Sequence, residues 1–178
     1  MDPVVLFELA TGDAATMVGR VRPEQWHAPT PCAEWDVEAL VAHMVGGFLY
    51  LESALGGDPS PVALDEPSYR DAVQRCVTKL WEPGALEHQC LSPAGFEWSI
   101  ADAAAGTAMD QVVHTWDLAV AIGADRQLDG EIVEACVAMF LPQMPAIGRE
   151  AGFIGPEVSV SADASAQEVL LGAMGRTA

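Results

Sequence analysis

The sequence has few basic residues. It contains 8 Lys and Arg residues against 26 Asp and Glu residues, which gives a formal net charge of −18. Proteins bind nucleic-acid phosphates and anionic lipid surfaces largely through Lys and Arg side chains. We therefore expect neither a nucleic-acid partner nor a membrane partner.

Long apolar runs and paired cysteines are also missing. No apolar segment approaches the roughly 18 residues of a membrane span, and the N-terminus has no basic segment followed by an apolar one. The four cysteines are widely spaced and form no C-x-x-C motif: Cys32, Cys76, Cys90 and Cys136. These absences predict a cytoplasmic protein with free thiols. Cys32 lies in a Pro-rich loop and is the thiol to test for reactivity.

Several common catalytic motifs are absent as well. The chain has no G-x-S-x-G, no P-loop, no H-E-x-x-H and no G-x-G-x-x-G in a strand-turn-helix context. The sequence therefore gives no support for the hydrolases, nucleotide-binding proteins and metalloproteases that these motifs identify.

Helical patterns dominate what is present. Good N-caps, together with Gly and Pro residues that stop helices, separate four long segments expected to be helices, at 3–21, 36–55, 68–81 and 99–123. A fifth segment at 129–143 and a short terminal helix at 165–174 follow, and residues 85–98 form a short hairpin or an irregular loop. Trp81 and Trp98 are expected in the core. The pattern predicts an all-α four-helix bundle that forms a single domain over residues 1–178.

Two polar residues stand out in the segment 99–123. Ser99, with Asp102 three residues later, is typical of a capping box, and Gly123 is a typical C-terminal stop. Within this helix Asp110 and His114 are four residues apart, so both side chains lie on one face. This spacing suits two ligands of one metal ion, and it equally suits a hydrogen bond or an ion pair on a helix surface.

Two further residues have alternative interpretations. His43 lies in the middle of a helix with almost no charge in its central turns, so it is either a hydrogen-bonded core residue or a metal ligand. In a bundle, ligands from facing helices can converge, which would bring His43 to Asp110 and His114. Asp117 follows His114 by three residues and is expected to be an exposed carboxylate; the alternative is that it orients a ligand from behind.

Four segments resemble a known family. They are 30–43 (TPCAEWDVEALVAH), 110–119 (DQVVHTWDLA), 153–160 (FIGPEVSV) and 170–176 (LLGAMGR). Together they resemble DinB-like proteins, and most closely the actinobacterial branch related to the N-terminal domain of mycothiol-dependent maleylpyruvate isomerase. The resemblance implies a DinB-like bundle that holds a divalent metal, zinc first and nickel as the alternative, through His43, Asp110 and His114. The isomerase has Glu where this chain has Asp110.

The resemblance also implies a function. Three N and O ligands leave a coordination position open, which is typical of catalytic rather than structural metal sites. The expected activity is that of a metal-dependent thiol transferase or isomerase, in which the ion activates a low-molecular-weight thiol such as mycothiol toward a small electrophilic substrate. The expected partners are this substrate and the thiol, and a homodimer is left open.

Two alternatives remain at this stage. One is a bundle that binds a metal or a small molecule without catalysis. The other is a metal-dependent hydrolase that uses a bound water as nucleophile, with His27 or Glu34 as its general base. Neither His27 nor Glu34 has a spacing that demands this role.

Overall fold

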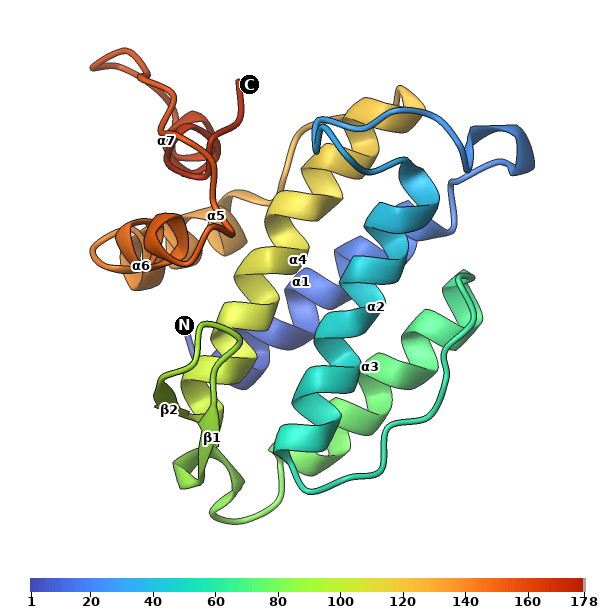
Figure 1. Ribbon diagram of the computed structural model, residues 1–178, viewed down its shortest axis with the longest axis vertical. Coiled ribbons are helices and arrows are strands. Elements are labelled where there is room, and N and C mark those ends of the chain that lie inside the picture. Colours follow the sequence, from blue (N-terminus) through green and yellow to red (C-terminus); the bar gives the residue numbers. More distant parts are fainter. Residues whose placement is uncertain (178) are drawn as a thin grey trace. The chain divides into compact units, whose positions relative to one another are not determined.

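The computed structural model describes residues 1–177 and is mostly helical (Figure 1). The chain divides into two compact units, Met1–Arg126 and Gln127–Ala178. That residues 1–178 form one domain stays a prediction. The first unit carries every residue proposed above as a metal ligand.

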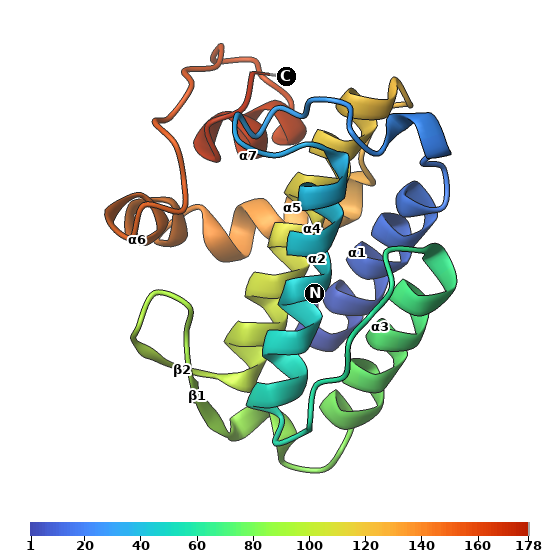
Figure 2. The same ribbon diagram turned by 45° about the vertical axis from the view of Figure 1, so that its right-hand side comes forward.

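Four helices build the first unit, as predicted. They are α1 (Pro3–Val18), α2 (Val37–Ala54), α3 (Glu66–Leu80) and α4 (Ile100–Ile122). Helices α3 and α4 each pack against both α1 and α2. Figures 1 and 2 show α2 running alongside α4. The all-α bundle is therefore confirmed, and it brings the middle of α2 next to the middle of α4.

Each of these helices begins at a side chain that accepts a backbone N–H. Asp36 accepts the amide of Ala39 at 2.9 Å to start α2. At α4, the Ser99 hydroxyl accepts the amide of Asp102 at 3.1 Å and the Asp102 carboxylate accepts the amide of Ser99 at 3.3 Å, which is the predicted capping box. Gly123 ends α4 in the left-handed conformation, at φ 69°.

The segment before α4 is a hairpin rather than an irregular loop. A short turn of 3₁₀ helix, Ala85–Glu87, leads into strands β1 (Gln89–Leu91) and β2 (Glu97–Ser99), which pair antiparallel. The Trp98 indole donates to the Tyr50 hydroxyl at 2.8 Å, and this hydroxyl donates to the carbonyl of Leu91 at 3.0 Å. A Cβ at Gly106 would lie 2.9 Å from the Trp98 ring, so glycine makes room for it. These contacts hold the start of α4 against α2.

Aromatic side chains fill the core of the bundle. The rings of Phe7 and Phe48, and those of Phe48 and Tyr69, meet edge to face with centroids 6.1 and 4.8 Å apart. The Tyr69 hydroxyl donates to the side-chain oxygen of buried Gln111, whose amide donates to the Met44 carbonyl at 2.9 Å. This chain of hydrogen bonds crosses from α3 through α4 to α2, directly beside Asp110 in the sequence.

Replacing Tyr69 by Phe is expected to lower the free energy of unfolding by about 1–3 kcal/mol, because it leaves the buried Gln111 oxygen without its donor. Urea denaturation of the metal-free protein measures the change. Tyr50→Phe is a matched control at a less buried hydroxyl. A larger loss in Tyr50→Phe than in Tyr69→Phe would contradict the assignment of the core hydrogen bond.

The second unit contains α5 (Gly130–Phe140), α6 (Met144–Glu150) and α7 (Ala166–Ala173). Helix α5 packs against α7, and the amide of Val158 donates to the Gly172 carbonyl at 2.9 Å. The terminal helix is as predicted. The fifth segment ends at Phe140 rather than at 143, and α6 was not predicted, because Pro145 starts a new helix after the turn instead of merely stopping the old one.

Among the described residues, no single helix has the length and apolar character to cross a membrane. Of the described helices, only the pair of α5 and α6 together, which is bent by 69° at the junction, has the length and the apolar composition of a membrane span.

Candidate metal centre

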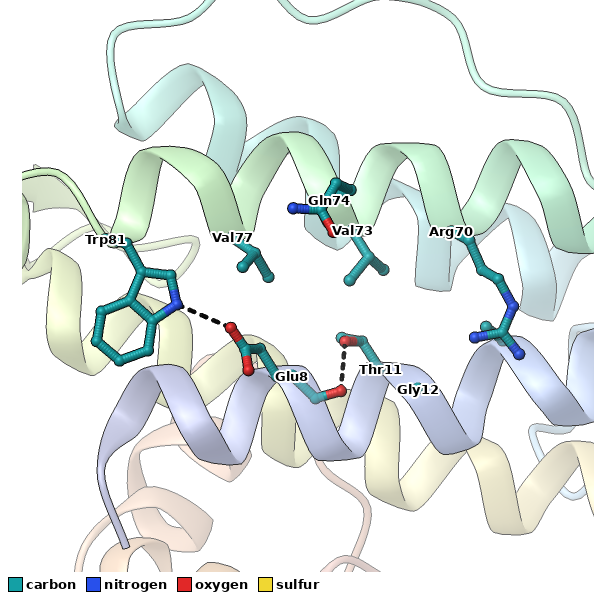
Figure 3. Close-up of a pocket in the computed structure, with 9 residues that line it drawn as sticks. Glu8, Thr11, Gly12, Arg70, Val73, Gln74, Val77 and Trp81 are labelled. Carbon is teal, nitrogen blue, oxygen red and sulfur yellow. Dashed lines mark hydrogen bonds between the residues drawn. The ribbon is translucent and has the colours of Figure 1, made fainter.

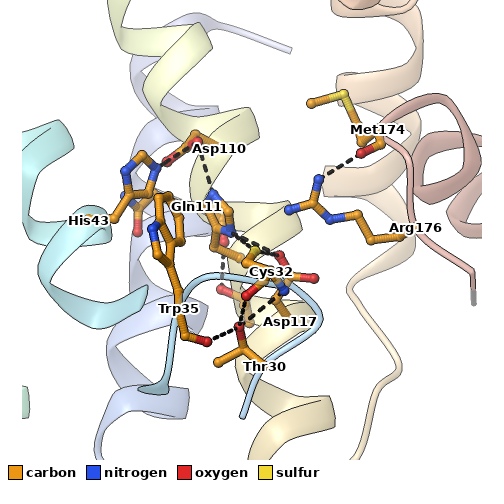
Figure 4. Close-up of polar contacts among 11 residues, drawn as sticks. Thr30, Cys32, Trp35, His43, Asp110, Gln111, Asp117, Met174 and Arg176 are labelled. Atoms are coloured by element: carbon orange, nitrogen blue, oxygen red, sulfur yellow. Dashed lines mark hydrogen bonds and ion pairs between the residues drawn. The ribbon is translucent and has the colours of Figure 1, made fainter. Parts of the chain in front are cut away.

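Three polar side chains from α2 and α4 converge at the middle of the bundle. His43 extends from α2 toward Asp110 on α4 (Figure 4), and its Nε2 lies 3.3 Å from each Asp110 carboxylate oxygen. His114, one turn after Asp110, places its Nε2 3.3 Å from Asp110 Oδ1. The structure thus brings together the three residues that the sequence proposed, and a metal ligand atom from each lies within 4.8 Å of the others.

The spacing of these atoms fits a divalent ion. An N–H···O hydrogen bond is typically about 2.9–3.0 Å long, whereas two ligand atoms that each lie about 2.0–2.1 Å from a tetrahedral ion are about 3.3 Å apart. The three distances of 3.3 Å to Asp110 are long for hydrogen bonds and agree with the second geometry. Two imidazoles and one carboxylate are also a donor set that suits zinc, with nickel as the alternative. That these residues bind an ion stays a prediction.

Charges perturb the pKa values of this cluster. Burial by itself would raise the pKa of Asp110, but the charge of His114 and the hydrogen bonds from His114 and His43 outweigh it and hold that pKa well below its ordinary value. Burial likewise opposes protonation of His114. The charge of Asp110 and hydrogen bonds to Asp110, Asp117 and Cys32 overcome this and raise the pKa of His114 well above its ordinary value. Without a metal, the contacts with Asp110, Asp117 and Cys32 favour the charged form of His114.

The two histidines differ in their exposure. The His114 side chain is 8% exposed, while that of His43 is 40% exposed. The interpretation of His43 as a core residue is therefore wrong. His43 marks the open side of the cluster and His114 its closed side.

Asp117 is not the exposed carboxylate that the sequence favoured. It is completely buried, and its Oδ2 lies 2.9 Å from His114 Nδ1. The Cys32 thiol donates to the same oxygen at 3.4 Å, and its sulfur lies 4.0 Å from His114 Nδ1. Asp117 and Cys32 therefore lie behind His114, next to Nδ1, the ring nitrogen that faces away from Asp110.

A loop before α2 covers the cluster. We call residues 26–36 the strap; it is closed by a bridge between Pro29 and Asp36. The Thr30 hydroxyl donates to the Trp35 carbonyl at 2.8 Å. The Trp35 ring lies 4.6 Å from the His43 ring and 5.8 Å from the His114 ring, between centroids. Trp35 thus forms a wall of the candidate site.

Sequence reasoning missed the role of Trp35. Trp35 lies outside α2, which begins at Val37 after the extended N-cap Asp36, so helical periodicity could not place its ring. The turn of the strap brings the ring to His43.

Comparison with known proteins adds a family to this geometry. Residues 7–119 match the family described as mycothiol maleylpyruvate isomerase N-terminal domain. The chain belongs to this family. The matched range includes the strap and the three converging residues. The predicted relationship is therefore confirmed, and it supports a role related to mycothiol.

Relatives of this chain occur in mycobacteria. Uncharacterized proteins MT0763 and Rv0738, from two strains of Mycobacterium tuberculosis, are each 28% identical over 163 residues, which cover 84% of this chain and 85% of each relative. They agree with the actinobacterial character of the sequence motifs. No solved structure matches the chain at a significant level of similarity.

The candidate general bases of a hydrolase lie in or beside the strap. The His27 side chain is 79% exposed, and its Nδ1 lies 3.2 Å from Asp36 and 3.7 Å from Glu38. The Asp36 carboxylate is within hydrogen-bond distance of this nitrogen, and the Glu38 carboxylate lies further away. Glu34 is exposed on the strap. Neither residue belongs to the groups of possible metal ligands that include His114.

A groove of about 490 Å³ lies away from the candidate metal centre, between α1 and α3 (Figure 3). Gly12, Ala15, Val73 and Val77 contribute to its lining. Trp81 stands at one end, 56% exposed, and its indole donates to Glu8 at 2.8 Å, so the expectation of a core position for Trp81 was wrong. His43, Asp110 and His114 do not line this groove, and we assign the chemistry to their cluster.

The metal-free protein is expected to be most stable between about pH 4 and 6.5. The raised pKa of His114 contributes stability that is complete below the ordinary histidine pKa, about 6.5, and is lost as the pH rises through the raised value. The lowered pKa of Asp110 contributes stability that is present above the ordinary aspartate pKa, about 3.9, and is lost as the pH falls through the lowered value. Urea midpoints of EDTA-treated protein, from about pH 2 to 9, measure both limits.

His114→Gln is the control for this pH dependence. This variant cannot become a cation, so its urea midpoint is expected to lose the part of the alkaline decline that His114 causes. Identical alkaline slopes for the wild type and His114→Gln would contradict the charged pair of His114 and Asp110.

Proposed function

We propose that the first unit binds a divalent ion, zinc first and nickel as the alternative, through His43 Nε2, the Asp110 carboxylate and His114 Nε2. We further propose that it binds a low-molecular-weight thiol such as mycothiol there, for transfer to a small electrophile or for isomerisation of that electrophile. The convergence of three ligand atoms around Asp110 carries the proposal. Membership of the mycothiol maleylpyruvate isomerase N-terminal domain family supports the choice of a thiol.

The bound ion would supply an open coordination position and a positive charge that lowers the pKa of the thiol. The residues of the chain then have separate roles. Asp110 provides the negative charge between the two imidazoles. His43 is half exposed, and Gly46, one turn further along α2, is open: a Cβ there would meet no atom within 4 Å. Substrate and thiol therefore have room to approach along this side of α2, beside Trp35.

The experiment uses cobalt as a spectroscopic substitute for zinc. The untagged protein is first tested for its metal content, then stripped with EDTA and loaded with Co²⁺. Addition of mycothiol is expected to produce a new near-ultraviolet band from a sulfur–cobalt bond, because thiolates are soft ligands that replace water on such ions. The oxygen analogue, in which a hydroxyl replaces the thiol, is expected to produce no such band.

Cys32→Ser is the essential control, because this thiol lies 4.0 Å from His114 Nδ1. A band that persists in Cys32→Ser comes from the added thiol. If Co²⁺ binds and neither mycothiol nor a simpler thiol changes the spectrum, the thiol part of the proposal is wrong and a bundle that only binds metal remains. If neither Co²⁺ nor Zn²⁺ binds, the metal part is wrong as well.

A further inference from the structure

The buried carboxylate of Asp117 has no role in the proposal above. Burying a carboxylate is costly unless charges or hydrogen bonds compensate, and Asp117 is completely buried. Its Oδ2 lies 2.9 Å from His114 Nδ1, a normal hydrogen-bond length. Asp117 follows His114 by three residues, so both side chains lie on the same face of α4. The pair is therefore built into a rigid helix.

The two nitrogens of His114 face different partners. Nδ1 faces Asp117, and Nε2 faces Asp110 and the ligand cluster. A carboxylate can only accept from Nδ1, so Nδ1 carries a proton. In the neutral ring this leaves the lone pair on Nε2, pointing to the position of the ion. The opposite tautomer would turn a proton toward the ion and prevent binding.

We infer that Asp117 is a positioning residue that holds His114 in the tautomer and ring orientation required for metal binding, and that it ties the strap to α4. This inference rests on the proposed function. In this inference Asp117 acts through His114 and the strap rather than as a ligand of the ion.

The link to the strap comes from Cys32. Its thiol donates to the same Asp117 oxygen that faces His114, at 3.4 Å. The Thr30 hydroxyl donates to the carbonyls of Cys32 and Trp35 at 3.2 and 2.8 Å, so it links these two residues within the strap. Loss of the Asp117 carboxylate is therefore expected to loosen Trp35 above His43 as well as to free the His114 ring.

The test compares Asp117→Asn and Asp117→Ala with the wild type in zinc affinity, by competition with a chromogenic chelator. Loss of such a partner typically lowers metal affinity about 10–100-fold, and this loss is expected for Asp117→Ala. Asp117→Asn keeps an oxygen acceptor of the same shape without the charge, so it is expected to retain part of the affinity. Thr115→Val is the matched control: Thr115 is a buried polar residue of α4 whose hydroxyl donates to the Gln111 carbonyl at 2.7 Å, and its zinc affinity is expected to be unchanged.

A second measurement separates positioning from mere stability. In the zinc-loaded, ¹⁵N-labelled wild type, NMR is expected to show His114 with its proton on Nδ1, and that proton is expected to exchange faster with water in Asp117→Ala. If the wild type binds zinc while Asp117→Ala binds it equally well, the inference is wrong and the proposed function stands. If Thr115→Val loses as much affinity as Asp117→Ala, a general structural effect replaces positioning. If the wild type binds no zinc, the proposed function itself is wrong.

Discussion

Replacing His43 by Ala is expected to weaken zinc binding at least about 100-fold and to leave the fold almost unchanged. Structural zinc sites with four ligands bind with about 10–16 kcal/mol, so each ligand contributes on the order of 3–4 kcal/mol, or a factor of several hundred. The His43 side chain is 40% exposed, so its removal leaves little buried space. Zinc affinity from chelator competition and the urea midpoint of the metal-free protein measure the two effects.

His27→Ala is the matched control for this variant. His27 is also a histidine beside carboxylates at the start of α2, and it belongs to another, more exposed group, His27, Asp36 and Glu38, that could in principle hold an ion. Zinc affinity is expected to be unchanged in His27→Ala. The reverse result, with His27 essential and His43 dispensable, would move the metal centre to the start of α2 and contradict the proposed site.

Replacing His114 by Ala is expected to abolish zinc binding and, in addition, to destabilise the metal-free protein by about 3 kcal/mol. The imidazole lies between Asp110 and Asp117, at 3.3 and 2.9 Å. Its removal takes a positive partner from a completely buried carboxylate and from a half-buried one. Most of the loss is expected from Asp117, because Asp110 keeps partial access to water. The urea midpoint of EDTA-treated protein, at a pH near 6, measures it.

The matched control is His88→Ala, a histidine exposed after the 3₁₀ turn. A substitution at such a surface position is expected to change the free energy of unfolding by no more than about 0.5 kcal/mol. Equal urea midpoints for His114→Ala and His88→Ala would show that the imidazole does not compensate the two carboxylates. The distinction between His43 as a pure ligand and His114 as both ligand and core residue would then be wrong.

Local features of the chain could be predicted from the sequence because they depend on residues that are neighbours in it. The capping box of Ser99 and Asp102 and the left-handed Gly123 involve residues within one turn, and both ends of α4 were predicted correctly. The shared face of Asp110 and His114 follows from helical geometry alone. The placement of His43 beside them came from the resemblance to a family and from the general way in which bundles assemble sites.

Features that depend on packing between distant segments were missed or misjudged. Tryptophan is usually found largely buried, yet α1 and α3 leave a groove at Trp81 and its ring is exposed. Aspartate is usually found at the surface, yet nearly every residue of this part of α4 is buried. The Asp117 carboxylate contacts the His114 imidazole on the same helix and the Cys32 thiol on the strap. Residue type predicts average burial, and these two positions depart from the average for reasons that lie on other elements.

The sequence by itself determined the helical bundle, both ends of α4 and the pairing of Asp110 with His114, because helix periodicity and capping are interactions over three or four residues. The tertiary structure alone decided that Asp117 is buried, that Cys32 joins it behind His114, and that Trp35 covers the ligand cluster. These depend on how the strap and α2 pack against α4, across 67 to 85 residues of chain. Only the folded chain brings such distant groups within reach of hydrogen bonds.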